Sequence, residues 1–126
     1  MKFIASFLIL FSMFLACTYE RNDQGVLVKF YNETGYDITD LNIGDKQIGA
    51  FKNNESTSYL VYDTFNFDGG MPDEQCSGII ADSKVICSNI FYWCGTEKKT
   101  EDNGTYKMSI KVSEIDSVRY FNITSK

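Results

Sequence analysis

The chain has 126 residues and a formal net charge of −5, with 17 Asp and Glu residues against 12 Lys and Arg. It contains no histidine, which excludes His-based catalytic triads, His general bases and most zinc sites. The acidic balance argues against a nucleic-acid partner and against a basic patch that binds anionic membrane.

The chain begins with an apolar segment that ends at a cysteine. Lys2 precedes a 13-residue apolar run over residues 3–15, which only two serines interrupt. A membrane span needs about 20 residues, so the run is typical of an export signal rather than of a spanning helix. The small residue Ala16 stands directly before Cys17, where a signal peptidase requires a compact side chain.

The sequence Phe14, Leu15, Ala16, Cys17 resembles the lipobox of bacterial lipoproteins, in the loose form found in Bacteroidota. The resemblance implies that residues 1–16 are removed and that the Cys17 thiol is acylated. The partner of Cys17 is then a lipid bilayer, and the protein belongs to the bacterial cell envelope. The expected location is the outer membrane, on its periplasmic or its surface side. The several acyl chains of a lipoprotein give an effectively permanent anchor.

The rest of the chain reads as a tether and one domain. Residues 17–24 carry the lipidated cysteine and a short polar tether, and residues 25–126 form a single domain. Residues 26–31 alternate between apolar inward positions and outward positions, as a strand does. Turn-forming residues follow over 32–35.

A three-stranded meander is predicted over residues 36–65. Its turns are expected at Gly44 with Asp45 and at Asn53 with Asn54, because these residue types tolerate positive φ. Asp40 interrupts the apolar alternation, which predicts a β-bulge. The turns impose a register that pairs Ile43 with Lys46, Leu41 with Ile48, Lys52 with Glu55, Ala50 with Thr57 and Ile48 with Tyr59. This register places the Tyr59 ring in the core.

The remaining elements complete an all-β pattern. They are predicted as a loop over 66–76, a hairpin over 78–86 that turns near residues 82–83, an aromatic strand over 88–94, a charged loop over 95–103, a strand over 105–112, a turn over 114–117 and a strand over 119–124. Alternation places Tyr106, Met108, Ile110 and Val112 of the strand over 105–112 inward, and Phe121 and Ile123 on one face of the last strand. Seven or eight short strands with frequent turns favour an antiparallel, immunoglobulin-like β-sandwich. A small open β-barrel is the alternative.

Three cysteines remain if lipid occupies Cys17. An exported protein is expected to oxidise one pair and to leave one thiol. A hairpin turn centred on residues 81–82 would make Cys76 and Cys87 cross-strand partners, whereas a turn at 82–83 would point them to opposite faces. In the second case Cys76 would pair with Cys94. Both pairings are open at this stage.

Acidic residues form two groups that suit either calcium or simple turn chemistry. The spacing matches no EF-hand loop, so capping and solvation of turns is the favoured interpretation, and no metal or cofactor is predicted. One group surrounds the first hairpin and the other the glycine-rich loop: Asp37, Asp40 and Asp45, and Asp63, Asp68, Asp73 and Glu74.

The glycine-rich loop is the predicted binding surface. It combines acidic groups with large apolar side chains that a short loop cannot bury by itself, which favours a basic or cationic partner. The predicted site consists of Asp63, Phe65, Phe67, Asp68, Met71, Asp73 and Glu74. Two further sequences, around Thr64 and Ser117, resemble the Asp-Ser/Thr-apolar sites that Bacteroidota O-glycosylate in exported proteins.

No catalytic set of residues is visible, so we expect a binding or structural module rather than an enzyme. Its partner would be a protein or a glycan, to which the lipid-anchored domain presents its loops. The alternative function is inhibition of a protease or of an envelope toxin. An inhibitor would need one rigid protruding loop, and residues 63–76 are the candidate.

Overall fold

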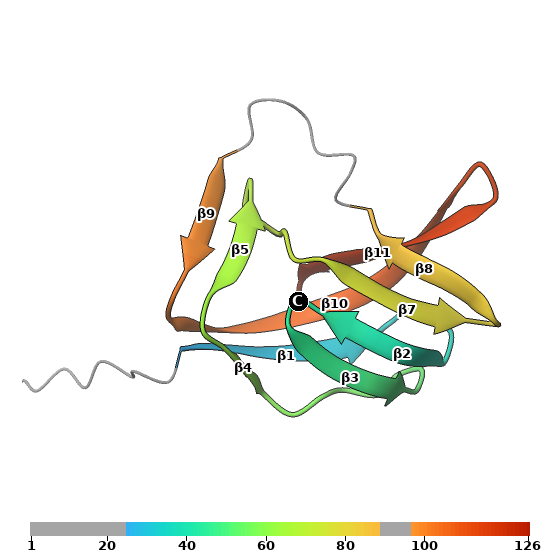
Figure 1. Ribbon diagram of the computed structural model, residues 1–126, viewed down its shortest axis with the longest axis horizontal. Helices are drawn as coiled ribbons and strands as arrows, with labels where there is room; N and C mark the ends of the chain where they lie inside the picture. The colour runs from blue at the N-terminus through green and yellow to red at the C-terminus, as the bar shows by residue number, and fades with distance from the viewer. Residues whose placement is uncertain (1–24, 89–96) are drawn as a thin grey trace, which may run out of the picture.

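The computed structural model describes residues 25–88 and 97–126, and the regular structure in these ranges consists of β-strands only. The predicted all-β class is therefore confirmed. In the described ranges there are eleven strands in two sheets (Figure 1). They are β1 (Val26–Asn32), β2 (Ile38–Ile43), β3 (Lys46–Phe51), β4 (Leu60–Tyr62), β5 (Phe65–Asp68), β6 (Met71–Pro72), β7 (Cys76–Ile80), β8 (Ser83–Cys87), β9 (Lys98–Glu101), β10 (Gly104–Ile115) and β11 (Val118–Ser125).

Eight of these strands form one strongly curved sheet, in the order β3-β2-β7-β8-β11-β10-β1-β4, which curls into a nearly closed barrel. A smaller sheet, in the order β6-β5-β9, lies at one end of it (Figure 1). Two pairs in the large sheet are parallel, β1 with β10 and β8 with β11. The pairing therefore departs from the purely antiparallel pattern expected, because segments distant in sequence meet side by side.

The core lies inside the barrel and follows the predicted alternation. Val26, Val28 and Phe30 of β1 are fully buried, as are Met108 and Ile110 of β10. The last strand buries two further predicted core residues, Phe121 and Ile123. The period of two in these strands predicted the buried face correctly, because each strand has one face on the core and one face outside.

The first hairpin of the predicted meander is present, with a shifted register. Ile43 pairs with Lys46 as expected. Leu41 pairs with Gly49 instead of Ile48, because irregularities interrupt the ladder on both sides of Leu41. Asp40 has a φ of 50°, which confirms the predicted bulge at this position.

The prediction of the second hairpin of the meander is wrong. The turn forms, since the Glu55 N–H donates to the Lys52 carbonyl at 3.1 Å, but the chain then leaves β3. It runs along β1 instead, where Thr57 N–H donates to the Phe30 carbonyl at 2.9 Å. Tyr59 consequently does not face Ile48, and its side chain is 41% exposed.

This crossing brings the two ends of the curved sheet together, and Asn32 links them. Its buried side-chain amide donates to the Phe51 carbonyl at the end of β3 and to the Tyr36 carbonyl, each at 2.9 Å. Its carboxamide oxygen accepts from the N–H of Thr34 at 3.1 Å and from the Thr34 hydroxyl at 2.7 Å. One side chain thus joins β1 to β3 and to the turn between β1 and β2.

The β7–β8 hairpin turns at Ala81 and Asp82, both at positive φ, which is one residue before the predicted position. The turn at 81–82 aligns Cys76 with Cys87, and the two form a disulfide with a Cα–Cα distance of 5.2 Å. This is one of the two pairings left open by the sequence. The β10–β11 hairpin turns at Asp116 and Ser117, inside the predicted turn.

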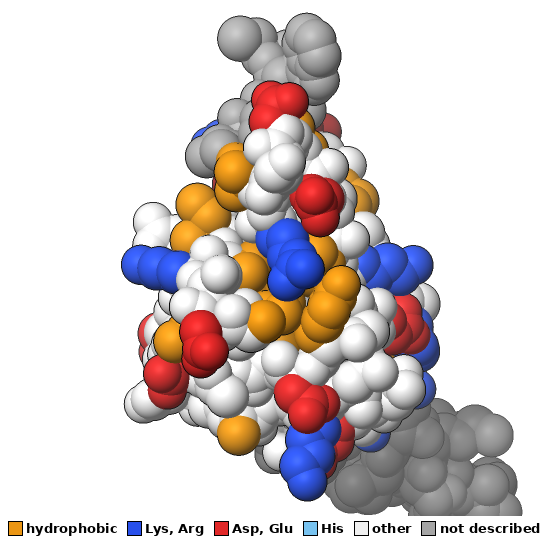
Figure 2. Space-filling view, turned by 90° about the vertical axis from the view of Figure 1, so that its right-hand side faces the viewer, with side chains coloured by type: hydrophobic (Ala, Val, Ile, Leu, Met, Phe, Trp, Pro, Cys, Tyr) orange, Lys and Arg blue, Asp and Glu red, His pale blue; other side chains and the backbone are white. Residues whose placement is uncertain are grey.

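The end of the barrel away from the small sheet carries an aromatic and basic contact. The Arg119 guanidinium lies over the Tyr36 ring, 4.8 Å from its centroid. Figure 2 looks onto this end and shows a basic side chain surrounded by hydrophobic ones, with acidic side chains around them. The acidic surroundings make this end unattractive to anions.

Candidate functional site

The predicted glycine-rich loop folds as a tight hairpin. Phe67 pairs with Pro72 and Asp68 with Met71, so β5 and β6 replace the loop expected over residues 66–76. Gly69 and Gly70 form its turn with φ values of 57° and 81°. Residues other than glycine tolerate such φ values poorly. The two glycines therefore form the turn of a hairpin, whereas the sequence predicted that they lie in a loop without strands.

The structure places the predicted binding residues in two environments. Phe65 is fully buried, and Phe67 and Asp68 are 8% and 5% exposed, so these three do not form an exposed patch. One carboxylate oxygen of Asp68, Oδ1, lacks a hydrogen-bond partner in the described ranges. Met71, Asp73 and Glu74 are half-buried, and Asp63 and Thr64 are exposed. The apolar side chains point inward because β5 packs over the end of the barrel.

The segment predicted as a charged loop contains β9 instead. β9 pairs antiparallel with β5 and sets Lys99 opposite Phe67. Lys99 and Glu101 therefore share the face of the small sheet that carries Phe65 and Phe67. Lys98 and Thr100 lie on the other face, where the Thr100 hydroxyl donates to the Asn66 carboxamide oxygen at 2.8 Å.

A series of aromatic rings joins the small sheet to the barrel. Neighbouring ring centroids lie 5.1 Å apart for Tyr62 and Phe65, 5.3 Å for Phe65 and Phe67, and 5.1 Å for Phe67 and Tyr106. Gly104 sets the place of the last ring, because a Cβ there would lie 2.9 Å from the Tyr106 side chain. A side chain at position 104 would push the ring away.

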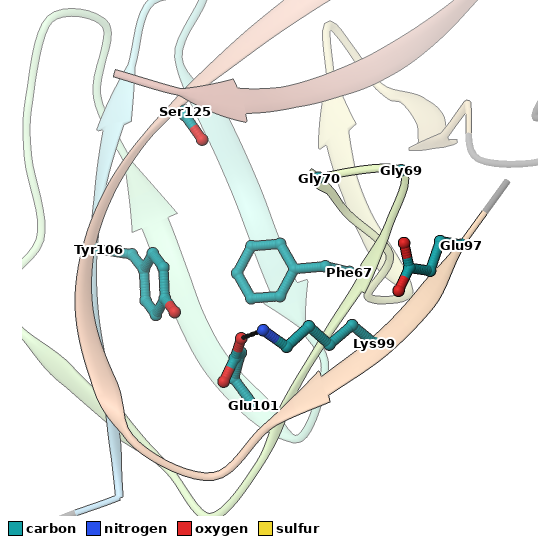
Figure 3. Close-up of a pocket in the computed structure, with 8 residues that line it drawn as sticks. All are labelled: Phe67, Gly69, Gly70, Glu97, Lys99, Glu101, Tyr106 and Ser125. Carbon is teal, nitrogen blue, oxygen red and sulfur yellow. Dashed lines mark ion pairs between the residues drawn. The ribbon is translucent and has the colours of Figure 1, made fainter.

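A groove of about 420 Å³ opens between the small sheet and β10, where this series ends (Figure 3). Figure 3 shows the Phe67 ring pointing toward Tyr106, with the Lys99 and Glu101 side chains beside it and the Gly69–Gly70 turn above. Its volume is within the range typical of small-molecule sites, roughly 300–1,000 Å³. The groove is lined by Phe67, Gly69, Gly70, Glu97, Lys99, Glu101, Tyr106 and Ser125.

A close ion pair forms the polar wall of this groove. Lys99 Nζ lies 2.7 Å from Glu101 Oε1. Glu101 accepts a hydrogen bond from the ammonium group and attracts its charge, and both effects raise the pKa of Lys99. Lys99 stays protonated, so the groove presents a donor and an acceptor side by side next to two aromatic rings.

A second hollow, of about 440 Å³, is acidic and lies on the other side of β5. Burial raises the pKa of Glu74, and the charges of Asp45 and Asp73 act in the same direction. The hydrogen bond that Glu74 Oε1 accepts from the Asn66 N–H, at 2.8 Å, opposes the shift. In the described ranges no three acidic or cysteine side chains gather in a way that could hold a metal ion.

The other predicted site residues have the following places. Thr64 is exposed beside β5, and Ser117 is exposed at the tip of the β10–β11 hairpin. Cys17, Cys94 and residues 89–94 of the aromatic strand predicted over 88–94 lie outside the described residues. Within the described residues there is no helix long and apolar enough to cross a bilayer.

Of the residues that line the groove, the sequence had singled out only Phe67 as a binding residue. Tyr106 was expected inward as part of the core, and Lys99 and Glu101 were assigned to a loop. The available signal was the alternation of residues 98–101, in which lysine 99 and glutamate 101 occupy one face. No apolar residue marks that face, so the strand pattern is invisible to hydrophobic periodicity.

Comparison of the chain with protein-family models, with curated proteins and with solved structures gave no match.

Proposed function

We propose that the chain is an exported, lipid-anchored envelope protein whose domain binds a neutral saccharide in the groove between the small sheet and β10. The lipobox-like residues before Cys17 support the anchor and an outer-membrane location. The Cys76–Cys87 disulfide is consistent with an oxidising compartment. The protein acts as a binding module and not as an enzyme.

The observation that carries the binding proposal is the ion pair beside the aromatic rings. Vicinal hydroxyl groups of a sugar match this arrangement, because one hydroxyl can donate to Glu101 while its neighbour accepts from Lys99. The apolar C–H face of the same sugar can lie against the half-buried Tyr106 ring, beside the small exposed part of Phe67. Glu97 and Glu101 disfavour an anionic ligand and the Lys99 ammonium disfavours a cationic one, so the groove suits a neutral ligand.

Inhibition of a protease or of a toxin finds less support. The candidate inhibitory loop over residues 63–76 contains the β5–β6 hairpin, and its Phe65 and Phe67 side chains are buried. An inhibitor of this kind presents its recognition residues on an exposed, rigid loop. The residues described over this segment do not offer one.

The saccharide proposal can be tested by screening the native protein against an array of bacterial and host glycans. Lys99→Ala should weaken binding of any glycan found at least tenfold, because it removes one of the two polar partners. Lys98→Ala is the matched control, since Lys98 lies on the opposite face of the same strand and is 78% exposed. Equal losses from both variants, or no glycan bound by the native protein, would contradict the proposal.

The anchor is tested separately by fractionation. The native protein should incorporate labelled fatty acid and pellet with membranes, whereas Cys17→Ser should do neither. A Cys17→Ser variant that still pellets, together with a native protein that takes up no label, would remove the anchor from the proposal. The glycan result does not depend on this outcome.

A further inference from the structure

The acidic net charge conceals one basic surface. β1, β4, β10 and β11 contain one carboxylate between them, Glu114, and it lies near the tip of the β10–β11 hairpin. Their outward positions carry lysines instead. Lys29 of β1 lies beside Lys107 of β10 in the parallel register, and Lys126 N–H donates to the Lys107 carbonyl at 2.9 Å. Three lysines therefore stand abreast on three neighbouring strands.

Lys111 extends this row along the outer face of β10. Lys126 forms an ion pair with Glu33, but Lys29, Lys107 and Lys111 have no carboxylate within ion-pair distance in the described ranges. Neighbouring strands are about 4.8 Å apart, and like charges directly opposite one another destabilise a sheet. Glu33 offsets part of this charge beside Lys126 and Lys111, and an anionic partner would compensate the rest.

Tyrosine rings lie between these lysines. Lys29 Nζ is 5.6 Å from the centroid of Tyr31 and 5.8 Å from that of Tyr59, and Lys126 Nζ is 4.5 Å from that of Tyr31. Val61, 48% exposed, pairs with Leu27 on the same face. Tyrosine and lysine side chains with a few aliphatic neighbours are typical of surfaces at the boundary between lipid and water.

We infer that this basic face, defined by Lys29, Lys107, Lys111, Lys126, Tyr31 and Tyr59, docks on the anionic headgroups of the membrane that holds the protein. The inference rests on the proposed lipid anchor. β1 starts at residue 26, close in sequence to Cys17. The seven residues between Cys17 and Gly25 reach at most about 25 Å, which keeps the domain at the lipid surface.

A lipid surface fits this face better than a soluble polyanion does. A nucleic acid would have to approach from solution a chain whose net charge is −5, and long-range repulsion would oppose the encounter. An anchored domain needs no such encounter, because the tether supplies a high local concentration of headgroups. Three unpaired lysines then suffice to select one orientation.

The consequence is a fixed orientation of the saccharide groove. The basic face lies on the outer side of β1 and β10, whereas the groove lies at the barrel end beside the small sheet. A domain that rests on the outer side of β1 keeps this end open to solvent at the edge of the lipid surface. Binding of headgroups and binding of a saccharide are therefore compatible.

The test measures amine labelling of the anchored protein in vesicles of phosphatidylcholine, with and without phosphatidylglycerol. Anionic lipid should slow the labelling of Lys29 and of Lys107 about fivefold or more, which corresponds to the attraction of about 1 kcal/mol that one lysine has for an anionic lipid surface. Salt at 0.5 M should abolish the effect, because it screens this attraction. Lys52 and Lys84, on other faces, should label equally in both. Equal labelling of Lys29 in the two lipids would overturn the proposal.

Two variants of equal charge separate orientation from net charge. In Lys29→Gln/Lys107→Gln, the ratio of the Lys111 labelling rates without and with anionic lipid should fall to near one. In Lys52→Gln/Lys84→Gln this ratio should stay at the value of the native protein. Loss of protection in both, or in neither, would contradict a specific face.

The mature Cys17→Ser chain, mixed with vesicles at millimolar lipid, tests the face without the anchor. Weaker protection of the same lysines supports the face even if fractionation shows that the native protein is not acylated. Protection of these lysines by duplex DNA but not by anionic vesicles would overturn the assignment to lipid.

Discussion

Asn32 shows how one buried polar residue can hold a fold together. It is fully buried, and its two amide hydrogens and its oxygen take part in four hydrogen bonds that join β1, β3 and the following turn. Asn32→Ala should lower the free energy of unfolding by about 3 kcal/mol, since it removes the partner of the Thr34 N–H, the side-chain donor to the Phe51 carbonyl and one of the two donors to the Tyr36 carbonyl. Urea denaturation with the disulfide intact measures this change.

The control for that measurement is Asn42→Ala, because Asn42 makes one exposed hydrogen bond, to the Asp40 carbonyl at 2.8 Å. We expect a loss of about 0.5 kcal/mol there. Similar losses from the two variants would show that Asn32 does not link the ends of the sheet.

Glu74 gives the protein a pH dependence with a definite sign. Its pKa is raised in the fold above the ordinary pKa of 4.5 that it has in the unfolded chain. The folded state therefore prefers the protonated carboxyl more than the unfolded state does. The stability that this preference contributes is present below about pH 4.5 and is lost as pH rises through the folded pKa. Glu74→Gln should therefore raise the urea midpoint at pH 7 and leave it nearly unchanged at pH 4.

Glutamine can still accept the hydrogen bond from the Asn66 N–H, so the variant removes the charge and keeps this contact. Glu114→Gln, at the exposed tip of the β10–β11 hairpin, is the matched control and should change neither midpoint. A Glu74→Gln variant that is less stable at pH 7 than the native protein would show that the carboxylate is stabilised in the fold.

At the scale of single elements, the β7–β8 hairpin depends on its covalent link. Cys76 and Cys87 close a loop of 11 residues, and such a loop predicts a stabilisation of about 2–3 kcal/mol from the restricted unfolded chain. Cys76→Ser/Cys87→Ser should lose this amount in urea denaturation. Reduction of the native protein should lower its stability to the same level.

The same pairing predicts one free thiol in the exported protein, at Cys94, if Cys17 is acylated. Maleimide labelling followed by peptide mass spectrometry counts it. A peptide that links Cys94 to Cys76 would show that the hairpin pairing is not the one that forms in the cell.

The elements that the sequence predicted well are those with local signals. The turns at Gly44 with Asp45 and at Asp116 with Ser117 were found because turn residues and apolar alternation agree there. The prediction of the second hairpin failed because the favourable turn at 53–54 is followed by a segment, ending in β4, that pairs with β1, 23 or more residues earlier. Local pattern cannot distinguish these partners, so Tyr59 was expected in the core that Tyr62, 2% exposed, occupies.

Two kinds of feature could not be predicted from the sequence, the pairing of strands that are distant in the chain and a strand made of polar residues. β1 and β10 lie parallel and nearly 80 residues apart, and no short-range feature specifies that contact. β9 consists of Lys98, Lys99, Thr100 and Glu101, which lacks an apolar face. The groove depends on both β9 and β10, so only Phe67 of its lining could be named in advance.

At the scale of the whole molecule, net charge proved a poor guide to surface charge. A chain with an excess of five acidic residues still gathers Lys29, Lys107 and Lys111 on one face, because the alternation of each strand sorts its side chains by face. Composition reports a sum over all faces. The pairing of strands decides which charges become neighbours, and the proposed orientation on the membrane follows from that pairing.

The two sheets should unfold as one unit, because the aromatic series begins and ends in the barrel. Phe30 of β1 and Tyr62 of β4 have ring centroids 6.5 Å apart, and the series returns to β10 at Tyr106. Phe65→Ala removes a fully buried ring from its middle, and should cost about 3–5 kcal/mol. Native-state hydrogen exchange in low urea should show that the amides of β5 and β1 open with the same free energy.

In Phe65→Ala the opening free energies of the β5 and the β1 amides should fall by the same amount. The same should hold in Phe51→Ala, which removes a buried ring from the barrel alone. Thr100→Ala, which removes one exposed hydrogen bond in the small sheet, should leave both nearly unchanged. If the small sheet opens independently, β5 amides will exchange at a lower free energy than β1 amides, and Phe65→Ala will lower the β5 value alone. In that case the groove would close and open apart from the barrel, and ligand binding should protect β5 amides without protecting those of β1.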